Sequence, residues 1–106
     1  MGNRGERQAK IQAVFSKAAS SVVGKLTKDL KPDQILFCID GDFVEVTARF
    51  NNERPDILVR FAIAKDQHVL MVAPPPVLGI GNLSDDAIVA NIAEAIAYTV
   101  RKEIGA

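Results

Sequence analysis

The sequence predicts an α+β fold in which two terminal helices pack on one face of a four-stranded antiparallel sheet, in the order α-β-β-β-β-α. Apolar residues recur at helical spacing near both ends of the chain, and they alternate with polar residues between those ends. Turn signals separate the central segments at hairpin spacing. With 106 residues, one domain over residues 1–106 is expected, in which residues 1–5 are flexible.

The first helix is predicted from Glu6 to about Asp29. Its apolar positions fall in a stripe about 120° wide when successive residues are placed 100° apart, which is typical of an amphipathic helix. They are Ile11, Phe15, Ala18, Ala19, Val22, Leu26 and Leu30. Asn3 and Glu6 have the spacing of a capping box, and Pro32 must end the helix because proline lacks a backbone N–H.

Four strands are predicted in the centre of the chain. Residues 35–50 have the pattern of two strands around a tight turn at Gly41, where glycine supplies the positive φ of a hairpin. The third strand is expected over Ile57–Ala64. The fourth is expected over His68–Ala73, where the run V-L-M-V is apolar on both faces.

A proline- and glycine-rich segment, residues 74–83, is predicted to connect the fourth strand to the last helix. Its three prolines favour an extended, polyproline-like exit from the strand. Val77, Leu78 and Ile80 are apolar although they lie on this connector. We expect them to close the open end of the core, and docking of a partner is the alternative.

The last helix is predicted to begin at Ser84. The serine hydroxyl would cap the helix, and Asp85 and Asp86 would lie in its positively polarised first turn. Gly105 is the expected stop signal. The apolar face consists of Ile88, Val89, Ile92, Ala93, Ile96 and Val100.

The strands carry more apolar residues than two helices on one face can cover. Leu58, Ala62 and Ala64 lie on the second face of the third strand. The first helix, about 24 residues long, would span about 36 Å, whereas four strands make a sheet about 15–20 Å wide. A second copy of the chain would cover both the apolar second face of the sheet and the part of the first helix that extends beyond it, so we predict a homodimer.

Gly79-Ile80-Gly81-Asn82-Leu83-Ser84 resembles a dinucleotide-binding fingerprint in its glycine spacing. Asp85 and Asp86 would repel a phosphate at the following helix, and no further strand follows that helix. The sequence also lacks the GKS or GKT of a phosphate-binding loop. No cofactor is therefore expected.

No catalytic or metal-binding set is apparent. His68 is the only histidine and has no obvious orienting partner, so a solvated histidine is favoured over a catalytic one. Cys38 lies within a strand and is expected to be buried and inert. Asp40 and Asp42 flank the hairpin glycine, which explains them by turn chemistry better than by calcium binding.

The first helix carries a basic ridge beside its apolar stripe, formed by Arg7, Lys10, Lys17, Lys25 and Lys28. Residues 1–32 hold seven basic and two acidic side chains, a net charge of +5. The rest of the chain holds six basic and eleven acidic side chains, a net charge of −5, so the whole chain is neutral. A solvated face is favoured. Nucleic acid or an acidic protein surface is the alternative partner of the ridge.

The sequence favours a small non-catalytic homodimeric binding or assembly module that works through protein–protein contacts. Its candidate interface residues are Val77, Leu78, Ile80, Leu58 and Tyr98. The alternatives are nucleic-acid association through the basic ridge, and small-molecule binding in a pocket near the Pro74–Gly81 loop. The chain shows no signal-peptide pattern and no apolar run of about 20 residues, so a cytoplasmic location without membrane contact is expected.

Overall fold

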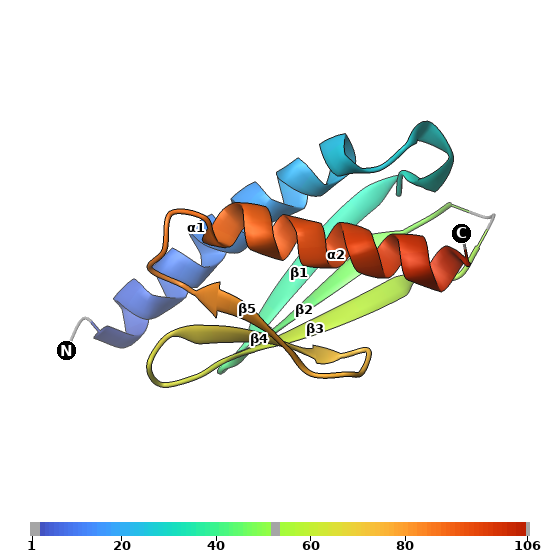
Figure 1. The fold of residues 1–106 in the computed structure, drawn as a ribbon. Coiled ribbons are helices and arrows are strands. Elements are labelled where there is room, and N and C mark those ends of the chain that lie inside the picture. Colours follow the sequence, from blue (N-terminus) through green and yellow to red (C-terminus); the bar gives the residue numbers. More distant parts are fainter. Residues whose placement is uncertain (1–2, 52–53, 106) are drawn as a thin grey trace.

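Two helices cover one face of a five-stranded antiparallel sheet (Figure 1). The computed structural model describes residues 3–51 and 54–105, and side chains from residue 5 onward. The elements are α1 (Asn3–Lys25), the 3₁₀ turn η1 (Lys28–Leu30), β1 (Gln34–Asp40), β2 (Phe43–Arg49), β3 (Ile57–Ile63), β4 (His68–Ala73), β5 (Leu78–Asn82) and α2 (Ile88–Ile104). The α+β class and the position of the helices on the sheet are confirmed.

The sheet is a meander in the order β1-β2-β3-β4-β5, so β1 and β5 form its two edges. Asp40 pairs with Phe43 across the β1–β2 turn. Gly41 has φ of 61° there, in the left-handed region that glycine adopts without a steric penalty. The predicted hairpin is therefore confirmed.

The predicted connector is wrong in one respect, because part of it forms the fifth strand. Leu78 pairs with Met71, so the chain reverses across residues 72–77 and does not leave β4 in a polyproline-like extension. The pairing shifts register between Val69 and Leu70. The glycines and prolines of this segment signal turns, whereas pairing with β4 determines its conformation.

The predicted start of the last helix is also wrong. α2 begins at Ile88 after Ala87, and its first turn holds no acidic residue. The Ser84 hydroxyl is used elsewhere, because it donates to Gln67 Oε1 (2.8 Å) and accepts from Lys10 Nζ (3.0 Å). Asp85 and Asp86 therefore precede the helix. The predicted stop is confirmed, since the Gly105 N–H caps the last carbonyls.

The first helix is shorter than predicted at its C-terminal end. α1 ends at Lys25, and Leu30 lies in the separate turn η1. Gly24 stands in the last turn of α1, where its low helix propensity weakens continuation. The proposed capping box depends on the Asn3 side chain, which lies outside the described residues.

The core lies between the helices and the sheet. The predicted stripe contributes five buried residues, of which Ile11, Phe15, Ala18 and Val22 lie in α1 and Leu26 directly follows it. Phe15 and Phe61 meet edge to face with ring centres 5.3 Å apart. Leu83, which follows β5, is also buried at 1% exposure. The core is thus one cluster in which residues of both helices pack against the sheet, and β5 contributes to it only through the partly buried Ile80.

Neither of the two helices in the described residues lies on the opposite face of the sheet (Figure 1). Cys38 lies on this open face and is exposed, so the expectation of a buried thiol is wrong. The sequence places it between Phe37 and Ile39, but alternation along the strand turns those two toward the helices and Cys38 away from them.

Candidate functional site

An apolar groove runs between the outer side of α2 and the edge strand β5. Tyr98 stands on its α2 wall at 48% exposure, and Leu78 stands on its β5 wall at 40%. On one side of Tyr98, a hollow of about 160 Å³ is bounded by Pro74, Pro75 and Pro76. On its other side, a wider and more open hollow of about 420 Å³ extends along Ile80. We call this surface the α2–β5 groove.

The groove brings together three of the five predicted interface residues, Leu78, Ile80 and Tyr98. Ile80 is half-buried against the core, and its carbonyl accepts from Asn91 Nδ2 (3.2 Å). Val77 adjoins the groove and is 60% exposed. Val77 and Leu78 therefore do not close the end of the core as expected. Leu58 lies apart from these residues, on the open face of β3.

Several charged side chains near the groove contact other side chains. Arg101 donates to Glu94 Oε2 (2.6 Å), and Lys25 Nζ lies 3.7 Å from Glu94 Oε1. The hydrogen bond from Arg101 lowers the pKa of the Glu94 carboxyl, with the positive charges of Arg101 and Lys25 acting in the same direction. Lys102 Nζ lies 5.8 Å from the centre of the Tyr98 ring. The groove thus presents an apolar floor with a charge-balanced rim.

The open face of the sheet is a second apolar surface, but a mixed one. Leu36, Phe43 and Leu58 are its exposed large apolar residues. The Arg60 guanidinium lies 4.4 Å from the centre of the Phe43 ring and shields that ring by a cation–π contact. Glu45 is exposed and lies directly opposite Arg60 on the neighbouring strand.

The basic ridge is largely engaged within the fold. Arg7 binds Asp42 Oδ1 (2.5 Å) and donates to the carbonyl of Ile63 (3.0 Å). Lys10 and Lys25 contact Ser84 and Glu94, as described above. Of the five ridge residues, only Lys17 and Lys28 make no hydrogen bond or ion pair in the described part of the chain. These contacts favour a structural role over a polyanion site.

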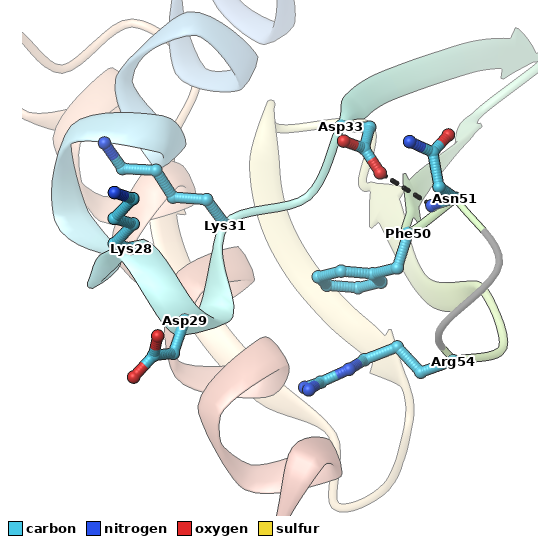
Figure 2. Close-up of a pocket in the computed structure, with 7 residues that line it drawn as sticks. All are labelled: Lys28, Asp29, Lys31, Asp33, Phe50, Asn51 and Arg54. Atoms are coloured by element: carbon cyan, nitrogen blue, oxygen red, sulfur yellow. Dashed lines mark hydrogen bonds between the residues drawn. The ribbon is translucent and has the colours of Figure 1, made fainter.

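A larger hollow, about 510 Å³, joins η1 to the turn after β2 (Figure 2). It is lined by Lys28, Asp29, Lys31, Asp33, Phe50, Asn51 and Arg54. The Asn51 N–H donates to Asp33 Oδ2 (2.6 Å), and the Arg54 guanidinium lies 5.6 Å from the centre of the Phe50 ring. Three basic and two acidic side chains nearly cancel here, so the net charge of the hollow gives little preference for an anion. Sequence reasoning missed it because its walls come from separate turns.

The remaining reactive side chains do not gather. His68 is exposed. Its backbone N–H donates to Asp66 Oδ1 (3.0 Å), whereas its imidazole has no hydrogen bond in the described ranges. Residues 3–51 and 54–105 contain no group of three histidine, cysteine, aspartate or glutamate residues suited to a metal ion.

Together these features define a two-layer α+β domain with an apolar groove at one sheet edge and an uncovered sheet face. Comparisons of the chain with protein-family models, curated proteins and solved structures find no match. Neither described helix is long and apolar enough to cross a membrane.

Proposed function

We propose that the protein is a small non-catalytic binding module that forms a homodimer and binds another protein through the α2–β5 groove. The supporting observation is that exposed large apolar side chains gather on separate surfaces. Leu36, Phe43 and Leu58 lie on the sheet, and Val77, Leu78 and Tyr98 lie at the groove. Single apolar residues are normal on a protein surface, whereas clusters mark sites of interaction.

The two edges of the sheet suit two different contacts. The groove lies at β5, and β1 is the opposite edge of the sheet. A contact between copies at the β1 side leaves both grooves free at the far ends of the dimer. The dimer then presents two equivalent sites, which raises its avidity for a partner with repeated motifs.

The chemistry of the groove favours an apolar protein side chain as its occupant. Tyrosine is enriched among the residues that dominate binding energy, because it buries a large ring at a small cost in side-chain entropy. The two hollows beside Tyr98, of about 160 and 420 Å³, are both open to solvent, whereas small-molecule sites bury most of the surface of their ligand. A metabolite is therefore a less suitable ligand than a side chain anchored between the prolines and the ring.

Static light scattering at micromolar concentration tests the homodimer, which should have twice the mass of one chain. Peptides selected from a random library on the wild-type protein then test the groove. We expect Tyr98→Ala to weaken their binding by at least about tenfold, a loss of about 1.4 kcal/mol. Leu58→Ala is the matched control, since Leu58 is similarly exposed but lies on the open face.

Two results would contradict the proposal. A single-chain mass across the micromolar range would remove the homodimer. Selected peptides that bind the Tyr98→Ala variant as tightly as the wild type would remove the groove as the binding site.

A further inference from the structure

The outer edge of β1 carries unpaired backbone groups. The Ile63 N–H donates to the Asp42 carbonyl (2.8 Å) across the β2–β3 side of the sheet. Backbone groups of successive strand residues point to opposite sides, so those of Phe43 point toward β1, and the alternation continues along β2. This fixes which residues of β1 bond to β2.

Leu36 and Cys38 pair with residues of β2 whose backbone groups point toward β1. These two residues therefore use their N–H and C=O groups within the sheet. Ile35, Phe37 and Ile39 point theirs outward, and in the described part of the chain no hydrogen bond to another segment satisfies them. β1 contains no proline, lysine or bulge, three of the features by which natural edge strands avoid pairing, and its one charged residue, Asp40, lies at its end.

The core is also incompletely closed along this edge. The side chains of Ile35, Phe37 and Ile39 point toward the helices but are only half-buried. The residues beside them on β2, such as Val44 and Val46, are buried at 1% exposure or less. An additional strand beside β1 would bury Ile35, Phe37 and Ile39 as fully as these residues of β2.

The flank of α1 above this edge is uncharged. It consists of Gln8, Gln12, Ser16, Ala19 and Val23. Contacts of Lys10 with Ser84 and of Lys25 with Glu94 turn the basic flank toward α2, and helical geometry places the uncharged flank on the other side. Two copies of α1 can therefore approach across the β1 edge without bringing like charges together.

We propose that two copies of the chain pair through β1, antiparallel about a twofold axis at Phe37, and so form one continuous ten-stranded sheet. This rests on the proposed homodimer and specifies its interface. Ile35 then exchanges hydrogen bonds with the partner's Ile39, and Phe37 with the partner's Phe37. The Gln34 amide meets the partner's Asp40 carboxylate at each end, where it can donate a hydrogen bond.

Two features select this arrangement over others. A twofold axis at Phe37 is the one that pairs all seven residues of β1, because a shift to Leu36 or Cys38 leaves strand ends unpaired. The open face suits a second copy less well. Arg60 lies over Phe43 there, and a face-to-face contact would have to remove it from water.

Disulfide trapping tests the interface, because Cys38 is the only cysteine. In the proposed register, residue 36 stands directly opposite the partner's Cys38, at the spacing that a disulfide spans. Leu36→Cys should therefore run mostly as covalent dimer on a non-reducing gel after mild oxidation. Leu36→Cys with Cys38→Ser should lose that dimer. Leu58→Cys, on the same face but two strands inward, should form no more covalent dimer than the wild type.

The outcomes separate the two proposals. Strong trapping of Leu58→Cys without trapping of Leu36→Cys would overturn pairing through β1 and indicate contact through the open face, with the homodimer retained. Trapping of Leu36→Cys that persists after Cys38→Ser would overturn the register at Phe37. A monomer in light scattering of the wild type would instead overturn the homodimer itself.

Discussion

Phe61→Ala is expected to lower the free energy of unfolding by about 3–5 kcal/mol. Phe61 is fully buried at the centre of β3, and its ring contacts Phe15 of α1 edge to face. Alanine would remove that contact and leave a cavity between the sheet and the helix. Urea denaturation at a fixed protein concentration measures the loss, and the fixed concentration keeps any contribution from dimerisation constant.

Leu58→Ala is the control for the loss of Phe61. Leu58 lies on the same strand, but its side chain points to the open face and is 54% exposed. We expect Leu58→Ala to lower the free energy of unfolding by less than about 1 kcal/mol. Equal losses for the two variants would contradict the assignment of the core to the helix-covered face.

Ile35→Pro is expected to raise the dissociation constant of the dimer by at least about 100-fold, which corresponds to about 2.7 kcal/mol. Proline removes the Ile35 N–H and places its ring where the partner strand would lie. The partner's Ile39 carbonyl then loses its donor, and the loss occurs twice by symmetry. The fold should persist, because this N–H points away from β2 and edge strands accept proline at such positions. Sedimentation equilibrium over a concentration series measures the change.

Ile35→Ala separates the backbone effect from the side-chain effect. It removes the same half-buried side chain but keeps the N–H, so its dissociation constant should lie much closer to that of the wild type. Equal weakening by the two variants would mean that the backbone of β1 does not contribute to the dimer.

Periodicity was sufficient to predict α1, the first four strands and the α+β class. The stripe from Ile11 to Leu26 is buried as the helical spacing predicts, because burial of an amphipathic face follows directly from that spacing. The alternation in β2 likewise predicts which of its side chains meet the helices.

The β5 region could not be predicted from local signals. Its two glycines and the prolines before it indicate a turn, and only pairing with β4 makes residues 78–82 a strand. Ser84 has the residue type of a helix cap, but its hydroxyl instead contacts Gln67 and Lys10, which are distant in sequence.

The candidate interface was predicted only in part, because exposure also depends on contacts between residues that are distant in sequence. Apolar identity does not determine exposure, as Val77 is 60% exposed whereas Leu83, six residues later, is buried. Leu58 and Tyr98 were grouped as interface residues, although they lie on different surfaces. The open edge of β1 depends on which backbone groups remain unpaired, and that follows from strand order and register.

Residue-resolved amide hydrogen exchange tests pairing through β1 most directly. The N–H groups of Ile35, Phe37 and Ile39 point outward, and those of Leu36 and Cys38 bond to β2. At concentrations where light scattering shows a dimer, all five amides should be protected, and dilution below the dissociation constant should release only the outward three. Rapid exchange at Phe37 in a sample that is demonstrably dimeric would contradict the proposed interface.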